Sequence, residues 1–428
     1  MSDTFMPFKT KKYLAIAKEP VFVGTGGYRI GRVDNTIVRD PATNLPKIPG
    51  STISGNARYY SWLSYKSESM NLNLGCSKGK KTEEQDPCGE CPVCLTYGFV
   101  KDKKAHSGLA YFSDARILFF PVPTMIGTVW LTSDEIVNEF IETGGDTISV
   151  ENNSFLYSQS LENSLPQNNE GKKILNFGWI MLEASNSINP EIWQIKKDTD
   201  DDEVANLTEI LNRINKRVCV VSENVFHHIV NSNLETRTSV SINPVTGAAE
   251  SGALFTYEAL PRGTVFILDV TYENPVNYMK DEPIEIVIGT VKKGFKLFSS
   301  LGIGGMGTRG FGKIEIIDSW LDEKKYWQKV KNFIEKLSSD IDKLVAEINE
   351  LNRKIEAEED DNKKEEMTKE KDKLEKEKQA VEKKKSLWIN YAYQLKTKLT
   401  GESTKYEEII KILDEIIELN GGINNGES

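Results

Sequence analysis

Two groups of residues in the first quarter of the chain have side chains suited to chemistry. Two aspartates, Asp34 and Asp40, lie in RVDNTIVRDPATNLPKIPGSTISG (32–55), where a short apolar strand leads through a Pro-Gly turn towards a helix. A carboxylate can bind a divalent cation or accept a proton. The second group is four cysteines with the spacing C-x11-C-x2-C-x2-C: Cys76, Cys88, Cys91 and Cys94.

The cysteine spacing predicts a metal site. Thiolates two residues apart on a Gly/Pro turn can point at one centre, and four of them close a tetrahedral zinc site with no open position. Such a site is structural, so we assign it no catalytic role. An iron–sulfur cluster is also compatible with four thiolates, and four unrelated reduced thiols are the third reading. The fifth cysteine, Cys219 in the apolar run RVCVVS, is predicted to be a core residue.

Two further stretches could hold phosphate groups. The glycines of LGIGGMGTRGFGK (301–313) free the backbone to approach a ligand, and Arg309 and Lys313 add positive charge. The stretch is not a P-loop, because no GK[ST] follows and the glycines precede a strand. The IPGSTISG turn places hydroxyl side chains at a helix N-terminus, which is either a phosphate cradle or an ordinary serine cap.

Composition limits the class of protein. The 428 residues carry a formal net charge of −10, which argues against a generic nucleic-acid binder and requires any such site to be a local groove. No apolar run is long enough to span a membrane, and the first residues lack the apolar core of a secretory signal. We therefore expect a cytoplasmic protein with no membrane partner.

The chain divides into two regions. Residues 1–320 mix apolar, strand-like stretches with Gly/Pro/Asn turns and a few helical segments, and residues 321–428 are dominated by Lys, Glu, Asp, Leu and Ile. A heptad pattern from Trp327 to Ile355 and a seven-residue repeat from Met367 to Leu395 predict an antiparallel coiled-coil hairpin. Its arms should have roughly 30 residues each, followed by a third helix that ends at Asn420-Gly421-Gly422.

The order of elements in 1–320 favours an α+β fold. A strand at about 12–23 is followed by a helix from Ser51 whose apolar face is Ile53, Ala57, Tyr60 and Leu63. A later strand, GLAYFSDARILFF (108–120), a helical segment and the strand FGKIEIIDSW complete a strand-helix-strand, strand-helix-strand order. With long insertions, this order fits a ferredoxin-like (RRM-like) core.

Taken together, these stretches resemble the RAMP superfamily, specifically the repeated backbone subunit of type III CRISPR effector complexes. The resemblance rests on four stretches and covers most of 10–320: GTGGYRIGRVDNTIVRDPATNLPKIPGSTISGNAR (24–58), SGLAYFSDARILFFPVPTMIGTVW (107–130), ETRTSVSINPVTGAAESGALFTYEALPRGTVF (235–266) and GIGGMGTRGFGK (302–313). It does not extend to the helical tail.

The resemblance implies an RNA-binding domain (1–320) with a palm, a zinc knuckle at 76–94 and a thumb β-hairpin at about 233–262, followed by the coiled-coil domain (321–428). The expected partners are a guide RNA (crRNA), the target RNA and other RAMP subunits. The thumb would splay one base at regular intervals. The family usually has Lys where this chain has Ser54, so one phosphate contact is weaker or supplied elsewhere. The RNA-binding residues that we expect are Gly26, Gly27, Arg29, Arg32, Arg39, Gly50, Ser51, Thr52, Ser54, Arg58, Arg237, Gly304, Gly305, Met306 and Arg309.

The resemblance also implies a role for Asp34, which matches the loop aspartate that cleaves target RNA beside each splayed base. The ribose 2′-hydroxyl attacks its own phosphate, and Mg²⁺ or another divalent cation offsets the developing charge. The products would be a 2′,3′-cyclic phosphate and a 5′-hydroxyl. The alternative for Asp34 is a solvent-facing turn residue, and we predict that Asp40 fixes its turn.

Two other functions stay open at this point. The chain could be a non-catalytic scaffold subunit of the same complex. It could instead process guide RNA through a histidine such as His227 or His228 in ENVFHHIVNSN. The tail is an addition to the family pattern, either a fused relative of the helical small subunit or a docking arm for another subunit.

Overall fold

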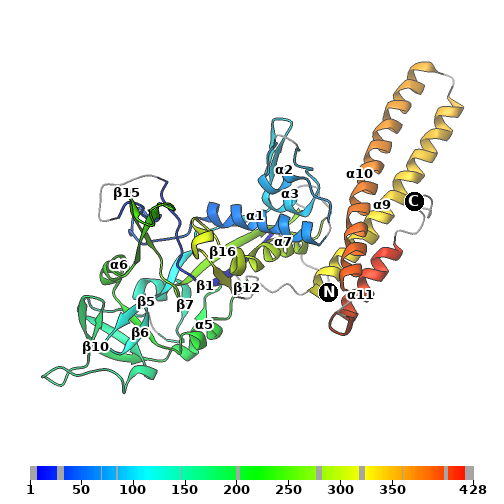
Figure 1. The fold of residues 1–428 in the computed structure, drawn as a ribbon. Helices are drawn as coiled ribbons and strands as arrows, with labels where there is room; N and C mark the ends of the chain where they lie inside the picture. The colour runs from blue at the N-terminus through cyan, green and yellow to red at the C-terminus, as the bar shows by residue number, and fades with distance from the viewer. Residues whose placement is uncertain are drawn as a thin grey trace.

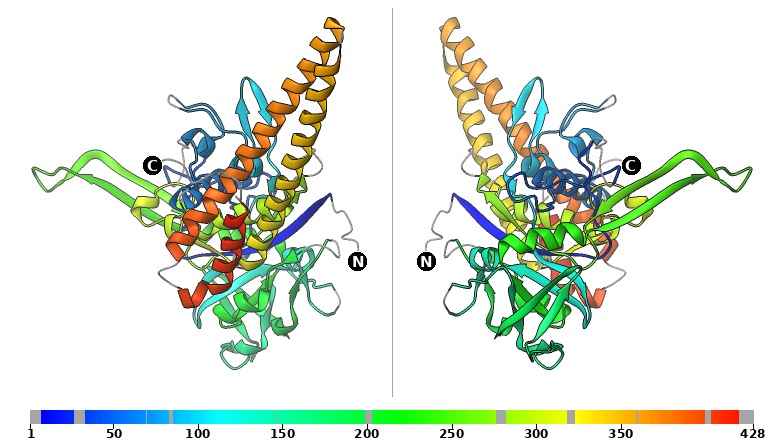
Figure 2. Two further views of the ribbon diagram at one scale, coloured as in Figure 1. Left: turned by 90° about the vertical axis from the view of Figure 1, so that its right-hand side faces the viewer. Right: turned by 90° about the vertical axis from the view of Figure 1, so that its left-hand side faces the viewer.

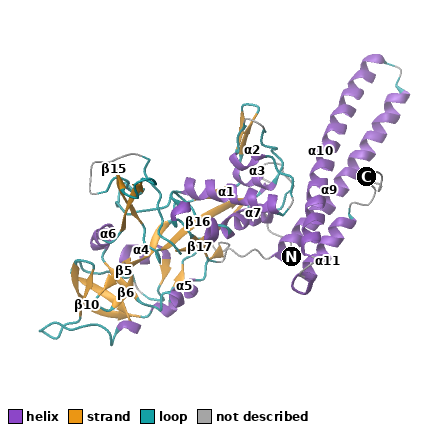
Figure 3. Ribbon diagram, viewed as in Figure 1, coloured by secondary structure: helices purple, strands orange, loops and turns teal. Residues whose placement is uncertain are grey.

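The computed structural model describes residues 7–26, 33–68, 70–82, 85–145, 147–198, 203–275, 282–317, 323–358, 360–399 and 403–419. They form a mixed α+β body and three C-terminal helices (Figure 1; Figure 3). The helices are α1 (Gly50–Ser67), α2 (Leu74–Lys78), α3 (Pro92–Tyr97), α4 (Asp134–Phe140), α5 (Leu207–Arg213), α6 (Glu223–Ser232), α7 (Ile284–Lys296), α8 (Phe298–Leu301), α9 (Glu323–Ala357), α10 (Asp361–Leu399) and α11 (Ser403–Glu418).

Among the described residues, the largest sheet has eleven strands, of which nine follow the order β12-β1-β16-β5-β6-β13-β8-β10-β9. In addition, β17 pairs with β1, and β4 pairs with β16. Their bounds are β1 (Phe8–Ala17), β4 (Ala110–Phe112), β5 (Arg116–Thr124), β6 (Gly127–Ser133), β8 (Ser154–Ser158), β9 (Ile174–Phe177), β10 (Ile180–Ile188), β12 (Glu203–Val204), β13 (Val218–Val221), β16 (Val265–Glu273) and β17 (Ile314–Ile316). Short pairs β2 (Phe99–Lys101) with β3 (Lys104–His106) and β7 (Ile141–Glu142) with β11 (Gln194–Ile195) lie outside it.

The centre of the sheet is antiparallel. β1 pairs with β16 along nearly its whole length, from Phe8↔Glu273 to Ile16↔Val265, and its C-terminal end also pairs with β17. On its other edge β16 pairs with β4 and β5. The strand predicted at 108–120 is therefore two strands, interrupted at Ser113–Ala115. The apolar run of β1 is buried on both faces of the sheet: Tyr13, which packs against Phe295 of α7, and Leu14 are fully buried.

Helices α1 and α7 pack against each other beside these strands. The Ser61 hydroxyl donates to the Thr290 carbonyl at 2.7 Å, and the two backbones are so close that a Cβ on Gly294 would lie 2.4 Å from the Ala57 carbonyl oxygen. Ile53, Ala57 and Tyr60 are buried as the helical spacing predicts, whereas Leu63 is half-buried. The buried face is wider than predicted because α1 contacts both the sheet and α7.

A long two-stranded hairpin leaves the body. β14 (Glu235–Ile242) and β15 (Ala249–Ala259) pair from Glu235↔Ala259 outward, with a register shift between Val240 and Ile242. The hairpin projects from the sheet in both views of Figure 2. Val245 near its tip is 91% exposed and Leu254 is 66% exposed, so its outer half has apolar side chains in solvent.

The C-terminal helices form a long hairpin, α9 with α10, closed at its base by α11 (Figure 1). The arms have 35 and 39 residues, somewhat longer than expected. An aromatic cluster at the base joins the tail to the body: Trp327 and Tyr391 are buried with ring centroids 5.1 Å apart, and Tyr391 also packs on Tyr65 of α1. The helical hairpin is confirmed, and its supercoiling stays a prediction. The predicted end at 420–422 lies outside the described residues.

The large mixed sheet with C-terminal helices confirms the predicted α+β class. Cys219 is fully buried in β13, as predicted, and burial raises the pKa of its thiol. Within the described part of the chain, no helix combines the length and apolar character needed to cross a lipid bilayer.

Candidate functional site

Asp34 is held at the base of the projecting hairpin. Its Oδ2 accepts two hydrogen bonds from Thr256 of β15, at 2.7 Å from the backbone N–H and 2.9 Å from the hydroxyl. The next residue along, Asn35, donates its N–H to the Thr256 carbonyl at 3.1 Å and accepts from the Glu258 N–H at 3.2 Å. The segment that carries Asp34 therefore pairs with β15 through one isolated parallel bridge, Asn35↔Tyr257.

The carboxylate of Asp34 is exposed and ionised. The backbone and side-chain hydrogen bonds from Thr256 lower its pKa below the ordinary value for aspartate. Oδ1 receives no hydrogen bond from another described residue, so one oxygen is free to face a ligand. A group with a lowered pKa is a weak general base at neutral pH, and a better electrostatic group or cation ligand.

Arg39 fastens the same segment two residues further along β15. Its guanidinium forms a bidentate pair with Glu258, at 2.7 and 2.9 Å, and also donates to Asn231 of α6. Glu258 is 8% exposed and accepts from the Ile37 N–H as well. We predicted that Arg39 binds RNA, but the structure uses its fork of donors to anchor the loop.

The glycine-rich loop packs on the other side of the hairpin base. Tyr257 and Phe311 are buried together, with Phe22, Phe255 and Met306 around them. The loop closes on the 20–22 segment through the Gly305 N–H to the Phe22 carbonyl, and a Cβ on Gly304 would lie 2.4 Å from that oxygen. Close backbone packing thus requires glycine here, whatever the loop binds.

Two predicted arginines remain at this base. Arg309 is exposed, with its guanidinium 6.0 Å from the centre of the Phe255 ring. Arg237 lies 4.7 Å from the Phe311 ring and pairs with Glu235, and its side chain is 41% exposed. Both can reach a ligand that lies along the hairpin.

The N-terminus of α1 is already capped by an acidic group. The Gly50 N–H donates to the Asp114 carboxylate at 2.8 Å, and Asp114 pairs with Lys47 at 2.7 Å. Gly50 is buried, Thr52 and Ser54 are half-buried, and Ser51 is exposed. A phosphate at this end would meet the Asp114 carboxylate, so the cradle is less open than the sequence indicates.

The preceding turn is fixed as predicted. Asp40 accepts from the Ala42 and Thr43 N–H groups, which together with Lys47 lower its pKa. Asp40 therefore has a structural role. Gly26 is exposed and has a positive φ of 80°. Gly27, Arg29 and Arg32 lie outside the described residues.

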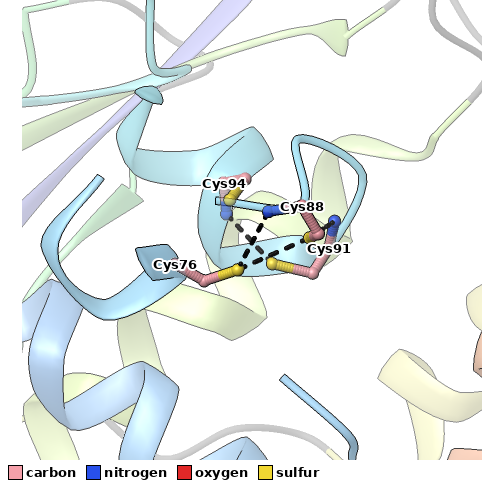
Figure 4. A group of neighbouring side chains, drawn as sticks. All are labelled: Cys76, Cys88, Cys91 and Cys94. Atoms are coloured by element: carbon pink, nitrogen blue, oxygen red, sulfur yellow. Dashed lines mark hydrogen bonds between the residues drawn. The ribbon is translucent and has the colours of Figure 1, made fainter. Parts of the chain in front are cut away.

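The four cysteines meet in one cluster between α2 and α3 (Figure 4). Their Sγ atoms all lie within 4.8 Å of one another, and none is in a disulfide. Backbone N–H groups point at the sulfurs: Cys88 N–H to Cys76 Sγ at 3.3 Å and Cys91 N–H to Cys88 Sγ at 3.3 Å. Amides directed at sulfur favour thiolates, so the donor set fits a tetrahedral metal ion.

Arg58 belongs to this cluster and not to the hairpin. Its guanidinium donates to the carbonyls of Cys76 and Gly98 at 2.9 and 2.6 Å, and desolvation lowers its pKa. Its positive charge lies beside Cys76, Cys91 and Cys94. The predicted contact between Arg58 and RNA has no support in this geometry.

The two histidines considered for guide-RNA processing are on a separate helix, α6. His227 and His228 lie on α6 with ring centroids 4.0 Å apart, and His227 contacts the Glu223 carbonyl of its own helix. No three-residue cluster of His, Cys, Asp or Glu with ligand spacing includes them among the described residues. Histidine-based processing of guide RNA stays a prediction.

Sequence reasoning missed Thr256 and Glu258. Both lie more than 200 positions from the loop that they hold, and no local pattern signals such a contact. The only hint is their alternation along β15, which places both on one face of the strand.

Comparison with known proteins identifies the class. A sequence model of the RAMP superfamily matches residues 16–315, which is most of the chain and excludes the three C-terminal helices. The chain belongs to the RAMP superfamily, and the resemblance predicted from the sequence is confirmed.

Two curated relatives narrow the comparison. The chain is 26% identical over 302 residues to the CRISPR system Cmr endoribonuclease Cmr4 of Pyrococcus furiosus, an alignment that covers 68% of this chain and 89% of the relative. It is 31% identical over 100 residues to the CRISPR system Cms endoribonuclease Csm3 of Methanothermobacter thermautotrophicus, covering 23% and 33%.

Two solved structures from Cmr systems align with most of this chain. A chain of the type III-B Cmr-beta complex bound to cognate target RNA aligns with a TM-score of 0.47 and 12% identity, covering 73% of this chain and 98% of that chain. Oligomeric Cmr4 from Pyrococcus furiosus aligns with a TM-score of 0.42 and 18% identity, covering 71% and 98%.

Proposed function

We propose that this chain is a crRNA-binding backbone subunit of a type III CRISPR ribonucleoprotein in antiviral defence, and that it cleaves complementary target RNA at Asp34. The observation that carries the proposal is the exposed, ionised carboxylate held by β15 at the root of the hairpin. The two relatives named as CRISPR endoribonucleases support it. Other RAMP subunits would be its protein partners, in the cytoplasm.

The strand pairing supports a ferredoxin-like palm. The order β17-β1-β16-β4/β5 is antiparallel throughout, and α1 and α7 connect its halves in a βαββαβ sequence. The hairpin β14–β15 occupies the predicted thumb position and has apolar side chains at its outer end, which suits a wedge between stacked bases. Guide–target pairing reads the sequence, so the protein needs only shape and phosphate contacts.

The chemistry uses the RNA's own nucleophile. Once a base is splayed, the ribose 2′-hydroxyl can align with the bond between its phosphorus and the 5′-oxygen of the next nucleotide. Attack forms a 2′,3′-cyclic phosphate and releases a 5′-hydroxyl. The Asp34 carboxylate, kept ionised by Thr256, accepts the proton of the attacking 2′-hydroxyl, and water protonates the departing 5′-oxygen.

A divalent cation bound at Asp34 would need further ligands from the RNA. Among the described residues the cysteines are the only cluster of three or more metal-ligating side chains, so Asp34 stands there as a single protein ligand. Mg²⁺ commonly binds one or two carboxylates together with substrate phosphates and water. When bound, such an ion would neutralise charge on the phosphate.

The four cysteines have a separate, structural role in this proposal. They would hold one Zn²⁺ in a knuckle at 76–94 inside the RNA-binding domain (1–320), with Arg58 as a compensating charge. The helical domain (321–428) would dock another subunit or line the target strand.

Asp34→Ala in the assembled complex tests the proposal. We expect target RNA to bind as tightly as in the unmodified complex, and cleavage at this subunit's positions to fall by at least a hundredfold, as for loss of a group needed in the transition state. Asp40→Ala is the matched control, because that aspartate fixes a turn nearby.

Unchanged cleavage by the Asp34→Ala complex would favour a scaffold subunit without catalytic activity. That second candidate agrees with the same palm and thumb, and differs only in assigning Asp34 a turn-forming role.

A further inference from the structure

We propose that Thr256 is a positioning residue for RNA cleavage. It orients the Asp34 carboxylate, and it makes the thumb strand β15 and the loop of residues 34–39 move together. This inference rests on the proposed function of Asp34 and assigns a role to a residue outside the loop.

Every polar group of Thr256 faces the loop. Its N–H and hydroxyl both donate to Oδ2 of Asp34, its hydroxyl oxygen lies 3.2 Å from the Asp34 N–H, and its carbonyl accepts from Asn35. Two donors on a single oxygen fix the plane of the carboxylate and direct Oδ1 away from the strand. A freely rotating aspartate side chain would present that oxygen only part of the time.

A second set of contacts joins the same loop to β15. Two residues along β15, on the same face, Glu258 holds Arg39 and the Ile37 N–H. Residues 34–39 are thus joined to β15 by alternate residues of that strand. Glu258 and Arg39 are largely removed from solvent, so this second anchor is rigid.

The mechanical consequence follows from the position of Thr256. β15 runs from the exposed outer part of the hairpin, near Leu254, into the buried base at Ala259. A hairpin displaced by a target strand moves Thr256, and Asp34 moves with it. Insertion of the hairpin and placement of the carboxylate therefore occur together.

The test compares three substitutions of Thr256 and one control substitution in the assembled complex. Thr256→Val removes the hydroxyl and keeps the β-branched shape, and Thr256→Ser restores the hydroxyl. Thr271→Val removes a hydroxyl that bonds Thr10 in the main sheet and serves as the control. Thr256→Ala, which is smaller than the native residue, is the second variant if valine prevents assembly.

We expect Thr256→Val to slow single-turnover cleavage roughly 10- to 100-fold while the affinity for target RNA is unchanged, with Thr256→Ser close to wild type. The pH profile distinguishes positioning from a general structural effect. Loss of a donor raises the pKa of Asp34, so the acidic limb of the cleavage profile should move to higher pH in Thr256→Val and stay in place in Thr271→Val.

The outcomes separate the two proposals. If Asp34→Ala abolishes cleavage but Thr256→Val and Thr256→Ala cleave at the wild-type rate with an unmoved acidic limb, the role of Thr256 is wrong and the role of Asp34 stands. If Asp34→Ala cleaves normally, the proposed function itself is wrong.

Discussion

At the residue scale, the same sequence stretch supplies side chains with opposite duties. Asp34 is exposed and its Oδ1 accepts no hydrogen bond from another described residue, whereas the guanidinium of Arg39 is paired with Glu258. Local sequence signals predicted the turn role of Asp40 and the cluster of four cysteines, whereas the role of Asp34 follows from the family resemblance and stays a prediction. The sequence could not predict the roles of the arginines, because those roles depend on partners distant in the chain. The guanidinium of Arg58, for example, donates to the carbonyls of Cys76 and Gly98.

Arg58→Ala should therefore destabilise the cysteine module and leave RNA affinity unchanged. The substitution leaves buried carbonyls without a donor, and we expect a loss of about 2 kcal/mol in the free energy of unfolding. Thermal denaturation and zinc content measure the effect, and Arg58→Lys should recover part of it. A variant with native stability and zinc content but weak RNA binding would return Arg58 to the RNA interface.

At the element scale, the apolar patterns of the sequence predicted where strands and helices form, but not which elements pair. The helix after the Pro-Gly turn and the helical hairpin follow from periodicity, whereas the strand predicted at about 12–23 is β1 (Phe8–Ala17), which begins and ends earlier than expected. The split of the 108–120 strand and the docking of loop 34–39 on β15 come from long-range hydrogen bonds. Close helix packing is likewise invisible in sequence, apart from the glycine that permits it.

Gly294→Ala tests the packing of α1 against α7. A methyl group there would lie 2.4 Å from the Ala57 carbonyl, and a backbone atom cannot move aside cheaply. We expect a loss of about 1–3 kcal/mol in the free energy of unfolding.

Gly55→Ala on α1 is the matched control, since a Cβ there has no atom within 4 Å. It should stabilise the helix by about 0.5–1 kcal/mol. Equal effects from the two substitutions in denaturant unfolding would contradict the close packing.

At the scale of the whole molecule, the tail is fixed to the body and is not a tethered appendage. Trp327 and Tyr391 are buried at the base of the helical hairpin, and Glu68 of the body accepts from Tyr391 and pairs with Lys293 at 2.7 Å. Lys383 of α10 also pairs with Glu90, between two of the clustered cysteines, at 3.1 Å. The heptads predicted the hairpin, but not that aromatic residues would anchor it to α1.

Trp327→Ala should release the tail. Loss of a fully buried tryptophan costs about 3–5 kcal/mol, so hydrogen exchange in 323–399 should accelerate and proteases should cut near the start of α9. Tyr393→Ala, at a position of α10 that is 55% exposed, is the control. Identical protection in both variants would contradict a docked tail.

The most direct measurement of the central claim is single-turnover cleavage of a complementary RNA by a complex that carries Asp34→Asn. Asparagine keeps the size of the side chain and removes its charge. We predict full target occupancy and no fragments with 2′,3′-cyclic phosphate and 5′-hydroxyl ends at this subunit's positions. Fragments with those ends, formed at the wild-type rate, would contradict the account.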